Sequence, residues 1–305
     1  MSTGQPSRSS LVFFNIQSPS ILCLNENIHT QNTLSFFSKI EDTLERGHSA
    51  EISFSVCTEI RPLAALLLFS TINNIQVRYG FTRVKINIPS RGTPLYNDSS
   101  LMRSGLWDAL TCKNETDIEN LILENNRFKT SQDPSIIKRV EEILRKIENL
   151  SAEHVFFLTM AIKEAVLNVI HHAYKRKESS IVPEAIENRW WQCAWVNIRK
   201  KEVNIIIHDR GVGILGTYND HYKSSEELLL EAMQQGISST GLTNRGMGSE
   251  DMKSPVNQLT GTQKLTIYTE RYVYSYSSCI LQPAVFERKD YICGTLVHWE
   301  CTYDD

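Results

Sequence analysis

The chain has 305 residues, 41% of them hydrophobic and 22% charged, so it is long enough for one large domain or two ordinary domains with a real core. The formal net charge of -3 gives no whole-chain indication of nucleic-acid or membrane binding. The seven cysteines include no Cys-x-x-Cys pair, which argues against a structural zinc site and favours free thiols in a reducing compartment.

The first part of the chain predicts a small α/β domain over residues 10–110. Residues 1–9 are polar and Ser-rich, a composition typical of disorder, and they do not resemble a signal peptide. Strand and helix patterns then alternate: the predicted strands are 10–16, 21–24, 51–56 and 84–88, and the predicted helices are 33–44 and 63–75. The longest apolar run in this part, 63–69, is too short to span a bilayer, so we expect a soluble, cytoplasmic protein.

Residues 111–150 differ in composition and predict a charged helical linker. Lys, Glu and Asn dominate there, and a helix is expected at 136–147. The second domain is expected over 151–305, with helices at 152–175 and 225–235, a C-cap at Gly236, and strands at 193–199, 203–208, 265–268, 272–275, 279–286 and 294–301. The predicted fold class is therefore α/β, a two-layer sandwich of helices on a mostly antiparallel sheet, preceded by the smaller α/β domain.

Three polar residues mark one face of the apolar helix at 152–175. Glu164, Asn168 and His172 are spaced by four residues and so share a helix face. A carboxylate and an amide oxygen are hard ligands suited to Mg²⁺, and a carboxylate can also deprotonate a water. On its own, the same stripe also fits the solvent-facing side of an amphipathic helix.

Two glycine-containing segments follow. Asp209-x-Gly211-x-Gly213 comes directly after an apolar strand, and a carboxylate at a strand end can accept a hydrogen bond from an amine such as that of adenine. Gly236–Ser249 is rich in Gly, Ser and Thr and ends in Arg245-Gly246-Met247-Gly248, a turn whose backbone N–H groups could cradle phosphate beside a helix N-terminus. Taken singly, the first segment also fits any tight turn, and the second fits an ordinary flexible loop or a mobile lid.

In order and spacing these segments resemble the GHKL superfamily, which includes gyrase, histidine kinases and MutL. Glu164 to Tyr174 looks like the N box of the family, Asp209-x-Gly211-x-Gly213 like its G1 box, and Arg245 to Gly248 like its G2 box; Gly294-Thr295 resembles the closing Gly-Thr element. The resemblance covers about half of the chain, roughly residues 151–300, and implies a Bergerat-type ATP-binding fold.

The resemblance also implies residue roles. Glu164 would be the general base, and Asn168 would ligate Mg²⁺, with Glu164 acting on the metal through water. Asp209 would bind the adenine amine, supported by Thr295. The remaining nucleotide-binding positions would be His171, His172, Gly211, Gly213, Arg245, Gly246, Met247 and Gly248.

Two positions depart from the family pattern. His171 stands where kinases of the family often carry Lys or Arg, which either puts one phosphate contact in doubt or makes it sensitive to pH. Ser249 stands where the family usually has Leu, which puts the start of the following helix in doubt.

The sequence of the helix at 152–175 is most similar to that of anti-sigma-factor serine kinases. Residues 10–110 weakly resemble a STAS-like interaction domain. No phospho-acceptor His in a histidine-kinase context stands upstream. We therefore expect a protein that binds ATP and Mg²⁺ and either hydrolyses ATP or transfers its γ-phosphate to a partner protein. A nucleotide-gated switch without catalysis is the alternative. The resemblance to the family suggests a homodimer, and the sequence indicates no nucleic-acid partner.

Three tryptophans lie together in the sequence before the turn of the predicted hairpin: Trp190, Trp191 and Trp195. They could anchor an interface, but core packing is the favoured interpretation, because buried Trp commonly packs domain cores.

Overall fold

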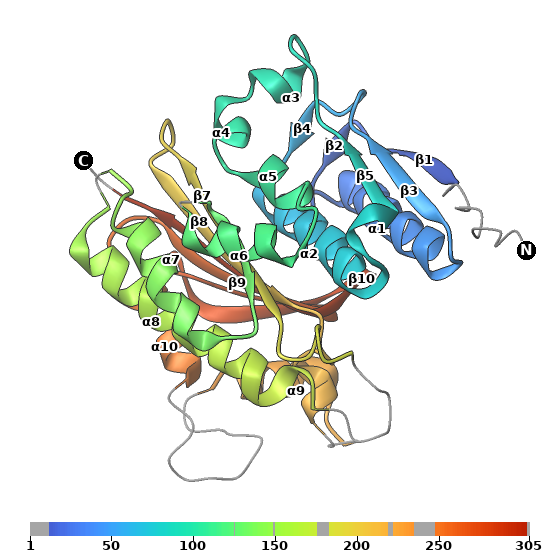
Figure 1. Ribbon diagram of the computed structural model, residues 1–305. Helices are drawn as coiled ribbons and strands as arrows, with labels where there is room; N and C mark the ends of the chain where they lie inside the picture. Colours follow the sequence, from blue (N-terminus) through green and yellow to red (C-terminus); the bar gives the residue numbers. More distant parts are fainter. Residues whose placement is uncertain are drawn as a thin grey trace, which may run out of the picture.

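The computed structural model describes residues 12–124, 126–148, 150–175, 183–218, 222–234 and 248–303 (Figure 1). These residues form three sheets, whose strand orders are β1-β3-β5, β2-β4 and β6-β7-β8-β10-β9. Helices and sheets are mixed along the chain, so the predicted α/β class is confirmed. The expected disorder of residues 1–9 lies outside the described residues.

The N-terminal unit is a parallel three-stranded sheet with its helices on one side. Its elements are β1 (Phe13–Gln17), β2 (Ile21–Leu22), α1 (Asn27–Glu45), β3 (Ser49–Ser53), β4 (Glu59–Ile60), α2 (Pro62–Tyr79) and β5 (Val84–Asn87). Helices α1 and α2 connect β1, β3 and β5 in sequence, as parallel strands require. Helix α2 begins at Pro62, as predicted, and every residue from 63 to 76 is buried.

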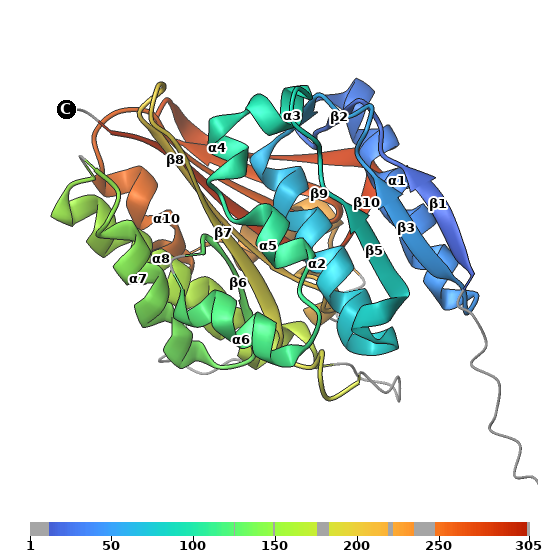
Figure 2. The same cartoon turned by 45° about the horizontal axis from the view of Figure 1, so that its top comes forward.

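Helix α2 is buried all round because it lies between two sheets (Figure 2). Its polar side chains therefore need partners inside the protein. The indole N–H of Trp191 donates to Oδ1 of Asn73 over 2.8 Å, from the five-stranded sheet to the helix. The N-terminal unit thus packs against one face of that sheet. The predicted separate arrangement, a two-layer sandwich beside a smaller domain, is not confirmed.

The chain then passes through short helices to the edge of the five-stranded sheet. The elements are α3 (Pro94–Asn97), α4 (Ser99–Met102), α5 (Leu106–Leu110), α6 (Glu115–Leu123), β6 (Phe128–Ser131) and α7 (Ile137–Leu144). Strand β6 pairs with β7, so part of the segment expected to be a linker belongs to this sheet. Patterning missed it because β6 is only four residues long and is flanked by charged sequence. The domain boundaries themselves stay a prediction.

A buried ammonium group fixes this connection. Lys129 on β6 is fully buried, and its Nζ donates to the carbonyl oxygens of Leu121, Ile122 and Glu124 over 2.7, 3.0 and 3.0 Å. These carbonyls end helix α6, where a positive charge is favoured. Burial lowers the pKa of Lys129 to about 8.

Side chains of the five-stranded sheet alternate between two cores. Its other strands are β7 (Trp190–Asn197), β8 (Glu202–Asp209), β9 (Gln263–Ser277) and β10 (Ile280–Thr302). Trp190 packs with the C-terminal helices, whereas Trp191 and Trp195 pack with the N-terminal unit. All three tryptophans are buried, which confirms that they pack in the core.

The last four predicted strands are in fact two long ones. Strands β9 and β10 pair along their length, with register shifts at three points along β10. Two of these register shifts lie near Glu270 and Gly294, whose φ angles are 53° and 77°. The backbone bends there while the two strands remain paired on either side. Sequence patterning interpreted these irregularities as gaps between separate strands.

The second face of the sheet carries the C-terminal helices α8 (Ala152–Asn168), α9 (Ser225–Ala232) and α10 (Gly248–Gln258), together with α7. Ser151 caps α8 by accepting from the backbone N–H of His154. The segment Ala152–Ala173 is long and apolar enough to cross a membrane by length and composition, and here its buried side packs on the sheet. Helix α9 ends at Ala232, and the predicted cap Gly236 lies outside the described residues.

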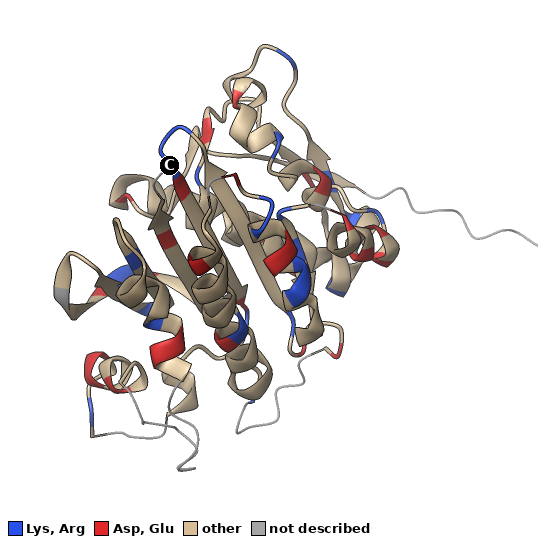
Figure 3. Cartoon of the chain, turned by 90° about the vertical axis from the view of Figure 1, so that its left-hand side faces the viewer, with Lys and Arg blue, Asp and Glu red and all other residues tan. Residues whose placement is uncertain are grey.

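Charged residues of both signs are interspersed over the described elements, as Figure 3 shows. All seven cysteines are free thiols, five of them buried. The predicted reducing compartment is not tested by this observation.

Because the two halves share the sheet, we predict that a cavity-forming substitution in the N-terminal unit destabilises both halves and that they still unfold in a single transition. Phe69 on α2 is fully buried and meets Phe128 of β6 edge-to-face at 5.9 Å. Phe69→Ala should lower the free energy of unfolding by about 3–5 kcal/mol, seen in urea titrations followed by Trp fluorescence and circular dichroism. Phe156→Ala, at a side chain that is 57% exposed, is the control and should change stability by less than about 1 kcal/mol. Two separate transitions in Phe69→Ala would contradict a shared core.

Candidate functional site

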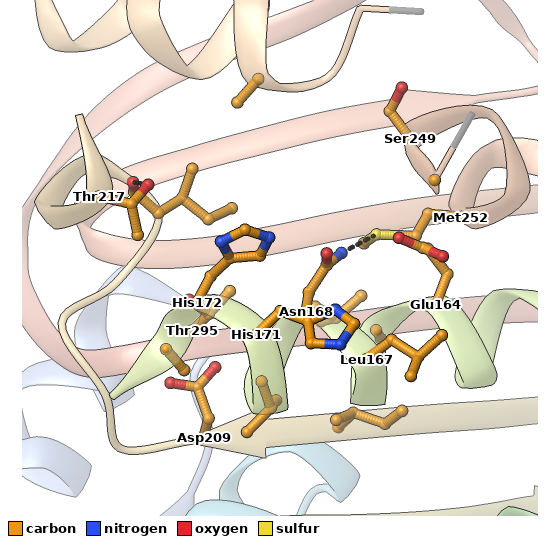
Figure 4. A pocket seen from close by; sticks show the side chains of 18 of the residues that line it. Glu164, Leu167, Asn168, His171, His172, Asp209, Thr217, Ser249, Met252 and Thr295 are labelled. Atoms are coloured by element: carbon orange, nitrogen blue, oxygen red, sulfur yellow. Dashed lines mark hydrogen bonds between the residues drawn. The ribbon is translucent and has the colours of Figure 1, made fainter. Parts of the chain in front are cut away.

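A cavity of about 410 Å³ lies between α8, the loop after β8, and helices α9 and α10. Its volume is within the range of small-molecule sites in proteins. Eight residues predicted from the sequence line it: Glu164, Asn168, His171, His172, Asp209, Gly213, Gly248 and Thr295. Figure 4 shows Asp209 and Thr295 at one end, Glu164, Met252 and Ser249 at the other, and Asn168 between them.

Helix α8 supplies the polar stripe, but its geometry changes at the stripe's end. The helix is α-helical only as far as Asn168, and residues Val169–Ala173 form one π-helical turn. The α-helix therefore ends at residue 168 and not at residue 175 as predicted, and a π turn follows it. A π turn places both His171 and His172 on the cavity wall, with their ring centroids 6.1 Å apart.

The π turn and the loop after β8 touch through their backbones. The N–H of Val212 donates to the carbonyl oxygen of Ala173 over 2.7 Å. A Cβ at Gly211 would lie 2.1 Å from that same oxygen, so no other residue fits at this crossing without displacement. Gly211 itself does not line the cavity; it sets the distance between the loop and α8.

Asp209 forms the floor of one end of the cavity. It is only 5% exposed, and its Oδ1 accepts the N–H of Gly211 over 2.8 Å. Burial raises the pKa of Asp209 to about 6, and hydrogen bonds from the Gly211 N–H and from the N–H and hydroxyl of Thr295 oppose this rise. The carboxylate is thus held in place by donors from the loop after β8 and from β10.

The Gly-Thr element approaches Asp209 equally closely from β10. Gly294 has a φ of 77°, and a Cβ there would lie 2.1 Å from the carbonyl oxygen of Asp209. Gly213 has a φ of 76° and lies against Oγ1 of Thr269, which accepts the N–H of Ile214 over 2.9 Å. Both glycines therefore serve conformation and close contact.

The other end of the cavity carries a partly buried carboxylate. Burial, followed by the negative charge of Asp251, raises the pKa of Glu164 above its usual range. A Cβ at Gly248 would lie 2.0 Å from Oε1 of Glu164, so the first residue of α10 rests on this carboxylate. Asn168 donates weakly to Sδ of Met252 over 3.6 Å, which leaves its carbonyl oxygen available as an acceptor or ligand.

The departure at Ser249 has a structural role. Its hydroxyl donates over 3.1 Å to the carbonyl oxygen of Gln234, just beyond the end of α9. A leucine could not make this bond, which ties together two walls of the cavity. The predicted phosphate-loop residues Arg245, Gly246 and Met247 lie outside the described residues.

The donors at this end fit magnesium. Asn168 and Glu164 offer amide and carboxylate oxygens, the hard ligands that Mg²⁺ prefers, and Asp251 adds a second carboxylate on the cavity wall. Among the described residues, no group of three or more His, Cys, Asp or Glu side chains is placed so that it could hold a metal ion by itself. Such a sparse donor set suits a metal held mainly by substrate phosphates.

Sequence reasoning missed several lining residues: Thr217, Tyr218, Met233, Asp251, Met252 and Val297. Asp251 and Met252 lie in the first half of α10, a helix of which the sequence indicated only the start. Thr217 and Tyr218 follow the glycine motif closely, which was the one available signal. Met233 and Val297 look like ordinary core residues in the sequence, and only the tertiary contacts reveal them.

Residues 129–248 match the family model for the histidine kinase-like ATPase domain. No curated protein matches the chain. The matched region contains Glu164, Asn168 and Asp209, ends at Gly248, and supports ATP binding by a GHKL-type domain. It does not extend to residues 10–110, for which the STAS-like resemblance stays a prediction, as does the likeness to anti-sigma-factor serine kinases.

We predict that Gly211→Ala separates the loop from α8. The added methyl group would displace the Ala173 carbonyl and break the hydrogen bond from Val212. Losing a buried backbone hydrogen bond should cost about 1–3 kcal/mol, measured by urea denaturation. Val212→Ala keeps the backbone contact and is the matched control. Equal stability of Gly211→Ala and wild type would contradict the observed contact.

A second prediction follows from the pKa of Asp209. Because the folded protein holds this proton more tightly than the unfolded chain does, stability present below the ordinary value of 3.8 is lost as pH rises through about 6. Between about pH 4 and pH 7, the free energy of unfolding of the ligand-free wild type should fall relative to Asp209→Asn by on the order of 1–3 kcal/mol. Asp42→Asn, which removes an exposed carboxylate on α1, is the matched control for the loss of one negative charge. A difference between wild type and Asp209→Asn that does not vary with pH would contradict the buried carboxylate.

Proposed function

We propose that this protein binds Mg-ATP in the cavity beside α8 and either hydrolyses it or transfers its γ-phosphate to a partner protein. One observation carries the proposal: eight residues chosen from four separate sequence segments line a single cavity. Chance motif matches would not be expected to meet in this way.

The two ends of the cavity suit the two ends of a nucleoside triphosphate. Asp209, a buried acceptor held by Gly211 and Thr295, suits the exocyclic amine of adenine. Glu164 at the opposite end, together with Asn168 between the two ends, suits the phosphates and their metal. The triphosphate would therefore run along α8 from its C-terminal end toward Glu164.

The chemistry at the phosphate end rests on Glu164. Its carboxylate would accept the proton of a water, or of a partner's hydroxyl, as that oxygen bonds to the γ-phosphorus and ADP leaves. A raised pKa brings this base closer to the working pH and improves its match to the task. Magnesium, when bound, would neutralise phosphate charge, and Asn168 would be its protein ligand.

A non-catalytic switch gated by nucleotide is the alternative. The partly buried carboxylate at Glu164 favours catalysis, since a pure binding module needs no base there. His171 in place of a basic kinase residue favours the switch. Two further parts of the proposal concern the phosphate acceptor, which is either water or a protein, and the assembly, a cytoplasmic homodimer. The N-terminal unit would serve as the partner or self-association module.

ATP turnover tests the catalytic proposal. With Mg²⁺ present, Glu164→Gln should retain ATP binding and lose turnover by about 10²–10⁴-fold, because the base is removed while the shape is kept. Glu153→Gln, at an exposed glutamate in the first turn of the same helix, is the matched control. Turnover that survives in Glu164→Gln would exclude Glu164 as the base. ATP bound by wild type without turnover would shift the conclusion to a kinase awaiting its substrate or to the switch, and a rate per molecule that rises with concentration would indicate a dimer.

A further inference from the structure

The loop that holds Asp209 is attached to the N-terminal unit as well as to α8. Successive side chains at the end of β8 point to opposite faces of the sheet. Asp209 faces the cavity, whereas His208 and Arg210 face the N-terminal unit. A residue on either side of the adenine acceptor therefore contacts helices that contribute nothing to the cavity wall.

Arg210 makes an ion pair across this boundary. One of its guanidinium nitrogens contacts the carboxylate of Glu41 on α1, and another lies 3.5 Å from Oγ1 of Thr71 on α2. The Arg210 side chain is 13% exposed and that of Glu41 is 28% exposed, so water screens the pair less than it screens a surface pair. Removing one partner would leave a poorly solvated charge beside the loop.

His208 adds a second attachment. Its Nε2 lies 3.0 Å from the carbonyl oxygen of Cys293, and its Nδ1 lies 2.9 Å from Oγ of Ser70 on α2. The carbonyl can only accept, so Nε2 carries the proton of the neutral ring. Nδ1 is then left as an acceptor facing the Ser70 hydroxyl, which also lies 3.0 Å from the carbonyl oxygen of Leu67. Burial, and then the charge of Arg210, lower the pKa of His208 to about 3, so the ring stays neutral.

Both backbone segments that hold the Asp209 carboxylate thus depend on the N-terminal unit. Cys293 directly precedes Gly294 and Thr295, which pack on and donate to Asp209. On the other side, the N–H of Arg210 donates to the hydroxyl of Tyr174 over 3.2 Å. The backbone of Arg210 is therefore held by the residue that follows the π turn, while its side chain is held by Glu41 on α1.

We propose that Glu41 and Arg210 are positioning residues for the nucleotide base: through their ion pair, helix α1 holds residues 209–214 in the geometry that selects adenine. This inference rests on the proposed function, because it concerns the same cavity. It assigns the N-terminal unit a part in nucleotide selection, in addition to any role in contacting partners. The competing interpretation is that the pair only holds the two halves together.

Base selectivity separates these interpretations. Dissociation constants for ATP and GTP are measured with the full chain and Mg²⁺ by titration calorimetry. Glu41→Gln should weaken ATP binding about tenfold, equivalent to 1.4 kcal/mol, and change GTP binding much less, so that the preference for ATP falls. Glu45→Gln, one turn further along α1 and exposed, is the matched control and should bind both as wild type does. The double charge reversal Glu41→Arg with Arg210→Glu should recover part of the preference.

A purely structural pair would give a different pattern. Glu41→Gln would then lower the melting temperature and leave the ATP-to-GTP ratio unchanged, and this result would overturn the inference. Amide hydrogen exchange of residues 210–214 in the nucleotide-free chain tests the positioning without ATP: exchange should be faster in Glu41→Gln than in Glu45→Gln. If the wild type bound no ATP, the proposed function would fail, while unchanged exchange in Glu41→Gln would separately remove the positioning role.

Discussion

The arrangement of the whole molecule follows from one constraint: the five-stranded sheet is buried on both faces, and its side chains must alternate between them. Strand β8 shows this most clearly. Ile205 and Ile207 pack with the C-terminal helices and Ile206 with the N-terminal unit, and the alternation continues to the strand end. Asp209 consequently opens into the cavity, while His208 and Arg210 open toward α1 and α2. A strand with one solvated face could carry the same Asp without attaching it to a second layer.

Many of the residues that line the cavity could be predicted from the sequence. Polar residues spaced by four on a helix and glycines after a strand are each common, but few kinds of site require both. Glu164, Asn168 and Asp209 were found in this way, and they meet in one cavity. Long-range packing was not readable. Helix α2 looks like an ordinary apolar helix in sequence, and nothing in its pattern says that its Asn73 will bond a tryptophan 118 positions away. Strand β6 was hidden by its length, and the bends in β9 and β10 were taken for gaps.

The glycines near the cavity act mainly by letting backbones approach. Gly211 lies on the carbonyl of Ala173, Gly294 on that of Asp209, and Gly248 on the carboxylate of Glu164. A side chain at the first two positions would push apart strands or loops that carry the acceptor, and at the third it would displace the carboxylate. The three glycines therefore mark three close contacts. At Gly211 and Gly294 an added Cβ would displace backbone atoms, whereas at Gly248 it would displace only the side chain of Glu164.

The second buried face of the sheet also limits how this chain could be divided. Trp191, Ile206 and Leu296 on that face are almost completely buried, and all of them contact the N-terminal unit. A fragment containing only the ATPase-like region would present them to water as one continuous apolar surface, a typical starting point for aggregation. Recombination that replaced the N-terminal unit would have to supply an equally apolar cover.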